Sequence, residues 1–259
     1  MQRDKTIVVR GRAFGGDTPV ICTPLVGRTR DAVLAEAGNV VAKEPDVVEW
    51  RVDFFEAIGD TRSVLETGRA LRAAVGDAPI IFTRRSAKEG GSPIPLDEAG
   101  VVALYDAVGA SGLVDFLDFE MGNEPAHVQS VVATAHAQRT RVILSYHNFG
   151  YTPGQEFLVQ RFLEAERLGA DIAKVAVMPR DRLDVLTLLA ATAVAHAKGG
   201  IPLISMSMGP LGAVTRMVGG LFGSSLSFAV GDAASAPGQM PIADLAAVFE
   251  VIARAKGAK

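Results

Sequence analysis

Cysteine is nearly absent from this sequence of 259 residues, and its only example, Cys22, cannot form a disulfide within the chain. Structural disulfides belong to oxidising compartments, so we expect a protein of the reducing cytoplasm. Cys22 stands in the apolar run VICTPLVG, where a thiol is more often a small buried hydrophobe than a nucleophile.

Long hydrophobic runs are missing as well. No segment approaches roughly 18 uninterrupted apolar residues, which predicts no membrane-spanning helix. The first residues, MQRDKTIVVRGRAFGGD, lack the apolar core of a signal peptide. The formal net charge is only −3, so the chain carries no overall positive charge for binding nucleic acid. An anionic ligand must therefore be held by local positive charge.

Histidine is scarce too. The chain has four, and none are spaced as in the HxH or HExxH motifs of zinc sites. Three of them fall within helical patterns, and only His147 ends an apolar run. We therefore expect no metal site, with Asp118, Glu120 and His147 kept as an alternative set of cation ligands.

What the sequence does contain is a repeated unit, a short apolar run followed by a longer segment with helical periodicity. The runs lie at residues 20–26, 47–55, 79–85, 113–120, 141–147, 171–177, 201–207 and 226–230. Such alternation over about 250 residues is typical of an α/β protein with a closed (β/α)8 TIM barrel. We expect one barrel domain over residues 1–259. The alternative is an open doubly wound sheet, which would be expected to have a GxGxxG turn after its first strand. The segment at that place, VGRTRDAV, lacks this motif.

Three local signals complete the expected architecture. The apolar stretch TIVVRG (6–11) precedes the repeats and predicts a short β-hairpin that caps the barrel floor. Asp97 and Asp181 are suited to cap the helices that follow them. The segment 231–242 is rich in Ala, Gly and Pro and predicts a long mobile loop near the end of the chain.

Charged residues interrupt several of the predicted strands in a regular way. Alternate residues of a barrel strand face the interior, so Glu49, Arg51 and Asp53 share one face of their strand. The pattern recurs in three later strands, which carry Asp118 and Glu120, Ser145 and His147, and Lys174 beside the small Ala176. Burying so many charges costs several kcal/mol per ion (of order the stability of a whole domain), so we interpret them as a functional site at the C-terminal rim.

Lys174 indicates covalent chemistry at that rim. It lies in the apolar strand DIAKVAV, where partial removal from water and cations such as Arg51 and Arg85 would disfavour its ammonium form. A free amine can attack a ketone to form an imine, which then serves as an electron sink for loss of the neighbouring proton. His147 is a suitable proton shuttle, and Glu89 is placed to orient its imidazole.

Seven segments in order are similar to one enzyme family, the type I 3-dehydroquinate dehydratases. They are EWRVDFFE (49–56), TRRSAKEGG (83–91), DFE (118–120), SYHNF (145–149), AKVAVMP (173–179), SMSMGPLGAVTRMVGGLFGSSLSFA (205–229) and SAPGQMP (235–241). The resemblance implies a (β/α)8 barrel that needs no metal or nucleotide cofactor and acts as a homodimer. It also implies dehydration of 3-dehydroquinate to 3-dehydroshikimate by syn loss of water.

The resemblance assigns roles to individual residues. Lys174 matches the imine-forming lysine, His147 the histidine that moves the C2 proton to the departing C1 hydroxyl, and Glu89 the carboxylate paired with it. Arg216 matches the arginine that grips the substrate carboxylate. The other matches bind or enclose the substrate: Glu49, Arg51, Arg85, Met206, Met208, Phe228, Ser235 and Gln239. Asp118 and Glu120 match acidic groups near the lysine.

Two points stay open at this stage. Arg84 and Arg85 are adjacent, and the spacing to Glu89 favours Arg85 as the family's arginine. Another class I Schiff-base lyase, such as an aldolase, is an alternative because GPLGAVTRMVGG is glycine-rich enough to hold a phosphate. A non-catalytic binding barrel is disfavoured because no member of the proposed catalytic set is replaced.

Overall fold

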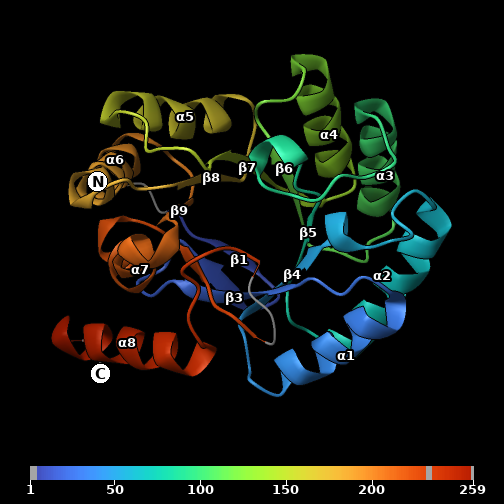
Figure 1. Ribbon diagram of the computed structural model, residues 1–259, viewed down its shortest axis with the longest axis horizontal. Helices are drawn as coiled ribbons and strands as arrows, with labels where there is room; N and C mark the ends of the chain where they lie inside the picture. Colours follow the sequence, from blue (N-terminus) through green and yellow to red (C-terminus); the bar gives the residue numbers. More distant parts are fainter. Residues whose placement is uncertain (1–4, 232–234, 258–259) are drawn as a thin grey trace.

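Eight parallel strands surround the centre of the molecule in the order in which they occur along the chain (Figure 1). The computed structural model describes residues 5–231 and 235–257. The strands are β3 (Val20–Leu25), β4 (Val47–Arg51), β5 (Ile80–Thr83), β6 (Phe116–Glu120), β7 (Arg141–Asn148), β8 (Ile172–Val177), β9 (Leu203–Ser207) and β10 (Leu226–Phe228). The first and last of them, β3 and β10, pair in parallel. The predicted (β/α)8 barrel is confirmed.

The barrel closes less regularly between β9 and β10. No ladder joins these two strands among the described residues, but the Ser225 N–H donates to the Leu203 carbonyl at 2.7 Å and a parallel bridge links Leu203 to Ser224. The barrel strands other than β7 are shorter than predicted, most clearly β4, which ends at Arg51 because residues 52–54 turn into a short 3-10 helix, η1 (Val52–Phe54).

Helices cover the outside of the barrel (Figure 1). They are α1 (Arg30–Val41), α2 (Thr61–Val75), α3 (Glu98–Ala110), α4 (Pro125–Ala137), α5 (Gln155–Arg167), α6 (Arg182–Lys198), α7 (Gly209–Val218) and α8 (Ile242–Ala255), with the 3-10 turns η2 (Ala87–Glu89) and η3 (Gly219–Phe222). The predicted caps are confirmed: Asp97 accepts from the Gly100 N–H at 2.8 Å, and Asp181 from the Leu183 N–H at 2.8 Å. None of the helices in the described part of the chain is long and apolar enough to cross a membrane.

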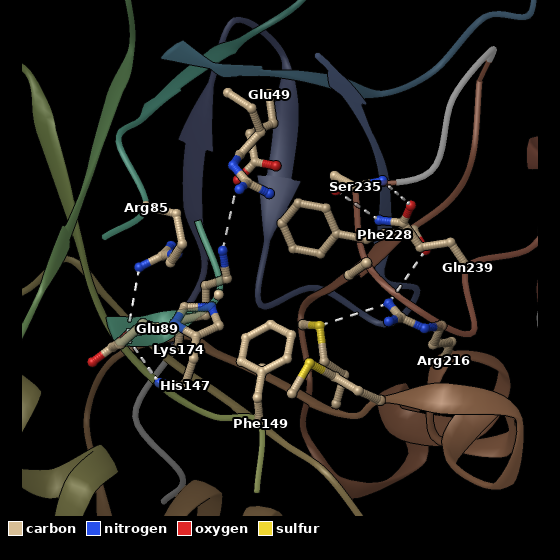
Figure 2. Close-up of a pocket in the computed structure, with 16 residues that line it drawn as sticks. Glu49, Arg85, Glu89, His147, Phe149, Lys174, Arg216, Phe228, Ser235 and Gln239 are labelled. Atoms are coloured by element: carbon tan, nitrogen blue, oxygen red, sulfur yellow. Dashed lines mark hydrogen bonds and ion pairs between the residues drawn. The ribbon is translucent and has the colours of Figure 1, made fainter. Parts of the chain in front are cut away.

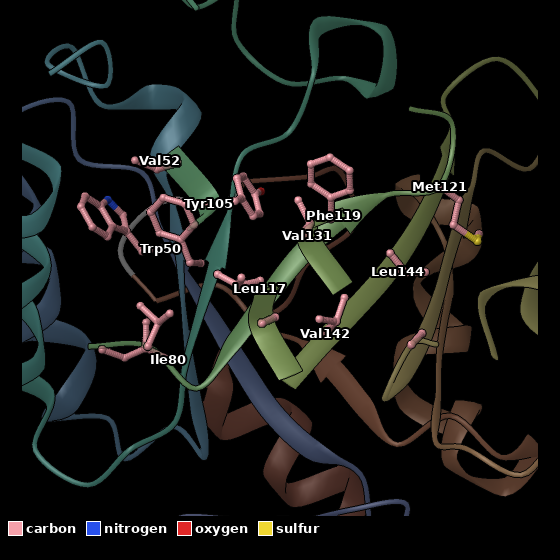
Figure 3. Close-up of a cluster of buried hydrophobic side chains, with 14 of the residues drawn as sticks. Trp50, Val52, Ile80, Tyr105, Leu117, Phe119, Met121, Val131, Val142 and Leu144 are labelled. Atoms are coloured by element: carbon pink, nitrogen blue, oxygen red, sulfur yellow. The ribbon is translucent and has the colours of Figure 1, made fainter. Parts of the chain in front are cut away.

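The larger hydrophobic core lies between the strands and the helices. Trp50, Phe82, Tyr105 and Phe119 form a row of edge-to-face rings with centroids 5.2–5.6 Å apart, and aliphatic side chains such as Leu144 continue the layer (Figure 3). Offset and edge-to-face contacts are the favoured geometries of aromatic pairs. This layer fixes the outward faces of β4, β5 and β6, and so fixes which residues point inward.

A second core fills the barrel floor beneath the charged layer. The hairpin of β1 (Ile7–Val9) and β2 (Arg12–Phe14) supplies Phe14, which is fully buried with its ring centroid 4.9 Å from that of Phe116. The rest of this layer is one inward residue from most strands: Val20, Cys22, Val47, Ile81, Ile143, Ile172, Ile204 and Leu226. The floor-capping hairpin is therefore confirmed. Burial raises the pKa of the Cys22 thiol, as expected of an inert hydrophobe.

Candidate active site

A pocket opens at the C-terminal mouth of the barrel, directly above the apolar floor (Figure 2). Its lining is Glu49, Arg51, Arg85, Glu89, Gly90, His147, Phe149, Lys174, Ala176, Met206, Met208, Arg216, Phe228, Ser235, Ala236 and Gln239. The structure thus brings together all twelve residues that the sequence predicts to be catalytic or substrate-binding. Asp118 and Glu120 are not among the lining residues; they lie buried behind Arg85.

Lys174 reaches into this pocket from the middle of β8. Its Nζ lies 2.7 Å from Asp118 Oδ2, 3.7 Å from Glu49 Oε1 and 4.6 Å from the centroid of the Phe228 ring. The sequence predicts cations beside this amine, whereas the contacts that the structure shows are two carboxylates and an aromatic face. The reason is the register of the barrel: Glu49 and Asp118 occupy the same inward layer as Lys174, on β4 and β6.

Arg85 and Asp118 form the buried centre of the charged layer. Arg85 Nη2 donates to Asp118 Oδ1 at 2.7 Å, and Nη1 donates to Ser145 Oγ at 2.9 Å and Glu120 Oε1 at 3.2 Å. Burial alone would raise the pKa of Asp118, but Arg85 and Lys174 hold it well below its ordinary value. Asp118 is therefore a fixed negative charge that orients both cations.

The two adjacent arginines point in different directions. Arg85 lines the pocket, while Arg84 turns outward to Glu98 on α3, with Nη2 to Oε1 at 3.0 Å. The Arg84 N–H also donates to Tyr105 Oη at 2.8 Å. Arg85 is the pocket arginine, as the spacing to Glu89 predicts.

His147 and Glu89 face each other at the rim. His147 Nδ1 lies 2.8 Å from Glu89 Oε2, and the His147 backbone N–H donates to the same oxygen at 3.0 Å (Figure 2). Burial and the Glu120 carboxylate raise the pKa of Glu89 to about 8. Burial, with Arg85 and Lys174, lowers the pKa of His147 well below its ordinary value. An oxygen that already accepts one N–H favours Nδ1 as a second donor, which leaves Nε2 unprotonated as a base.

Two glycines let the Glu89 turn sit against the site. Gly90 has φ +85°, and a Cβ there would lie 2.3 Å from the Phe149 ring. At Gly91 a Cβ would lie 2.0 Å from the Arg85 carbonyl oxygen. Close approach of this kind is possible only without a side chain. Sequence reasoning did not single out Phe149 or Gly90 as lining residues; both stand in the segments SYHNF and TRRSAKEGG, next to residues that it did select.

Arg216 is a buried cation without a carboxylate partner among the described residues. Its guanidinium contacts Met206 Sδ at 3.6 Å, the Phe228 carbonyl at 3.5 Å and the Pro237 carbonyl at 3.2 Å. Its Nε, also buried, has no hydrogen-bond partner there. Burial lowers the pKa of Arg216 to about 10. A desolvated guanidinium with unused donors is suited to bind an anion from a ligand.

The remaining predicted residues close the pocket. Gln239 accepts from the Ser235 N–H at 3.0 Å and donates to Ser235 Oγ at 3.2 Å, which ties the loop 235–239 together. Residues 232–234 of the predicted mobile loop lie outside the described residues. Met206 and Met208, both buried, form an apolar part of the pocket wall.

The alternative cation ligands are engaged otherwise. Within residues 5–231 and 235–257 no group of three or more His, Cys, Asp or Glu side chains is arranged to hold a metal ion. Arg85 and Lys174 each bond to one oxygen of Asp118, and Arg85 and the Ser86 N–H both donate to Oε1 of Glu120.

Comparison with known proteins places this site in a family. The family model described as type I 3-dehydroquinase matches residues 21–256. The 3-dehydroquinate dehydratase of Albidiferax ferrireducens is 54% identical over 258 residues, covering 99% of this chain and 98% of the relative. That of Aromatoleum aromaticum is 50% identical over 255 residues, covering 98% of each.

Solved structures agree with these sequence matches. The 3-dehydroquinate dehydratase of Geobacillus kaustophilus superposes with a TM-score of 0.95 at 47% identity, covering 97% of this chain and 98% of that one. A type I enzyme from Clostridium difficile, solved with covalent modified comenic acid, gives a TM-score of 0.94 at 35% identity, covering 98% of this chain and 100% of that one. The chain belongs to the type I 3-dehydroquinase family.

Proposed function

We propose that this protein is a 3-dehydroquinate dehydratase that converts its substrate to 3-dehydroshikimate through an imine on Lys174. The observation that carries the proposal is the shared pocket of one buried amine, one histidine–carboxylate pair and one buried guanidinium free to bind a carboxylate. The substrate class offers a ketone, an acidic neighbouring C–H and a carboxylate, which are the three features that these groups can address. The relatives named above carry the same activity in their names.

The first step is attack of Lys174 Nζ on the C3 ketone. The lysine must lose a proton to attack, and Asp118 and Glu49 are the carboxylates within 4 Å of Nζ. The proton released by Nζ passes to the hydroxyl of the tetrahedral adduct, which leaves as water and so forms a protonated imine between Nζ and C3. The positive imine withdraws electrons from C2 and makes its hydrogen acidic. Asp118, which Arg85 fixes through its other oxygen, holds the nitrogen in place and offsets its positive charge as that charge develops.

His147 then carries one proton in two steps, first away from C2 and then to the departing hydroxyl. Its Nε2 takes the C2 proton, and the electron pair passes to the imine nitrogen to give an enamine. Collapse of the enamine expels the C1 hydroxyl, which receives the proton from the same imidazole and leaves as water. One group acting on one face gives syn elimination. Glu89 stabilises the imidazolium between these steps through Nδ1. Hydrolysis of the imine releases 3-dehydroshikimate.

Binding is divided among the remaining residues of the pocket. Arg216 takes the substrate carboxylate, and Met206, Met208 and Phe228 pack against the ring. The polar side chains at the rim contact the ring hydroxyls or complete the closed site: Glu49, Arg51, Arg85, Ser235 and Gln239. Asp118 and Glu120 support Arg85 and Lys174 from behind.

Turnover and trapping test the proposal together. With 3-dehydroquinate the wild type should produce an ultraviolet-absorbing enone, and sugar phosphates, the substrates of the aldolase alternative, should give no reaction. Borohydride should reduce the imine and add the mass of the ligand to the peptide that contains Lys174. The exposed Lys88, in the neighbouring η2 turn, is the control. Lys174→Ala should abolish labelling and Lys88→Ala should not; labelling of any other lysine refutes the assignment.

We further propose that residues 1–259 fold as one domain and act as a homodimer in the cytoplasm. The pairing of β10 with β3 supports one domain, because both ends of the barrel share one sheet. Exposed apolar side chains on α6 and α7 support self-association: Leu183, Leu186, Leu211 and Val214. The single cysteine supports a reducing compartment. Sedimentation equilibrium should give twice the chain mass, and urea should unfold the barrel in one transition.

A further inference from the structure

Asp53 is buried just outside the pocket, in the 3-10 turn η1 that follows β4. Its side chain has no exposed surface, and it is not one of the described residues that line the pocket. A buried carboxylate persists only when charges and hydrogen bonds compensate it. Four N–H groups do so here, and they come from three separate places in the chain.

The first pair of these donors belongs to the pocket residue Arg51. Arg51 Nε donates to Asp53 Oδ1 at 2.8 Å, and Arg51 Nη2 donates to Asp53 Oδ2 at 2.9 Å. This bidentate contact fixes the plane of the guanidinium, and the ring of Phe54 lies 4.9 Å from its central carbon. Arg51 is thereby held in one orientation at the pocket wall.

The second pair of donors belongs to the loop that carries Glu89. The Arg85 N–H donates to Asp53 Oδ1 at 3.3 Å, and the Ser92 N–H donates to Oδ2 at 3.0 Å. The two donors bracket the turn in which the Glu89 and Gly91 amides bond to the Ser86 carbonyl. Asp53 therefore pins both ends of the segment whose tip orients His147.

We infer that Asp53 is a positioning residue that couples the substrate-binding guanidinium of Arg51 to the Glu89–His147 pair. This inference rests on the proposed function of those three residues. One carboxylate serves both groups, so its loss should impair substrate binding through Arg51 and proton transfer through Glu89, each by its own route. Misplacement of a reacting group by about 1 Å can cost on the order of 100-fold in rate.

Asp53→Asn, nearly equal in shape, tests the coupling because it replaces one acceptor oxygen with a donor and removes the charge. We expect KM to rise and kcat to fall, each by about tenfold. In the Glu89→Gln background, Asp53→Asn should still raise KM but change kcat by less than about twofold. In the Arg51→Gln background it should still lower kcat but leave KM within about twofold. A merely structural role would lower the active fraction equally in every background.

Asp115→Asn is the matched control. Asp115 also accepts from arginines, Arg10 and Arg72, and from one backbone amide, that of Ile80, but it lies just before β6 at the floor of the barrel. The Asp115→Asn variant should be less stable than the wild type, with unchanged KM and unchanged kcat per folded molecule. Borohydride should still label Lys174 in the Asp53→Asn variant. If the wild type itself showed neither labelling nor turnover, the proposed function would be contradicted instead.

Two results would overturn the inference. One is wild-type KM and kcat in Asp53→Asn; the other is an equal loss of kcat in the wild-type and Glu89→Gln backgrounds. If Asp53→Asn yields no folded protein, KM and kcat are measured instead for Asp53→Glu, which keeps the charge on a longer side chain, in the same two backgrounds. Failure of both variants to fold would assign Asp53 to folding itself and also overturn the inference.

Discussion

The imidazole of His147 and the carboxylate of Glu89 meet across 58 residues of sequence, with Nδ1 and Oε2 2.8 Å apart. The pair forms because β7 presents His147 at the rim while the turn after β5 brings Glu89 to it. The same oxygen receives the backbone N–H of His147 at 3.0 Å, so the carboxylate is fixed relative to the strand as well as to the ring. This relationship underlies the first two predictions.

His147→Ala should separate imine formation from proton transfer. The variant keeps Lys174 and its carboxylate partners, so borohydride should still label it. Turnover should fall by about 100-fold or more, since general acid–base catalysis typically contributes on the order of 10²–10⁴. Mass spectrometry and the enone assay measure the two quantities. Near-normal turnover would remove His147 from the mechanism.

Glu89→Gln should change how stability depends on pH. The folded-state pKa of Glu89 is raised to about 8, so the folded protein binds a proton there that the unfolded chain releases near its ordinary pKa. The stabilisation is thus complete at low pH and is lost as pH rises to about 8. Glutamine cannot ionise and escapes this loss.

The measurement is the free energy of unfolding in urea for both proteins. The difference, Glu89→Gln minus wild type, should grow by about 1 kcal/mol or more per pH unit between about pH 5 and 8, and then level off. Glu56→Gln, at an exposed carboxylate, is the control. A flat difference for Glu89→Gln would mean that Glu89 is ionised throughout the range.

Arg216→Met should raise the stability of the free protein and weaken substrate binding. The buried guanidinium has no carboxylate partner among the described residues, so an apolar side chain of similar length should stabilise the free protein by about 1–3 kcal/mol. Without the cation, binding of the substrate carboxylate should weaken by roughly 2–5 kcal/mol. Urea unfolding and KM report the two effects.

The contrast for this variant is Arg84→Met. Arg84 is also buried, but it is paired with Glu98 and points away from the pocket. Its replacement should lower stability and leave KM unchanged. An unchanged KM in Arg216→Met would show that another group binds the carboxylate.

Gly90→Ala should disturb the rim through the backbone. Gly90 has φ +85°, which costs a residue with a Cβ about 1 kcal/mol, and its Cβ would also lie 2.3 Å from the Phe149 ring. We expect lower stability together with at least about a tenfold loss of kcat, because Glu89 is the neighbouring residue. Gly76→Ala, at φ +60° in open space, carries only the backbone cost and should keep wild-type kcat. Equal kcat values in the two variants would contradict the prediction.

The sequence by itself determined the architecture and indicated the residues of the candidate site. Apolar runs at regular spacing specify the barrel because a strand with two apolar faces can be buried only between helices and an interior. Charged residues two positions apart near the ends of β4 and β6 indicate which face turns inward, since side chains alternate along a strand. Lys174 and His147 are therefore visible in the strand pattern, whereas Arg216, which lies in α7, is indicated by the family resemblance.

Only the tertiary structure decided how these groups are partnered. Strand register sets Asp118 and Glu49, rather than Arg51 and Arg85, against the amine of Lys174. The early end of β4 turns Asp53 out of the strand and behind Arg51, because residues 52–54 leave the extended conformation for η1. Contacts between residues far apart in the chain depend on three-dimensional packing, and no local pattern of residues encodes them.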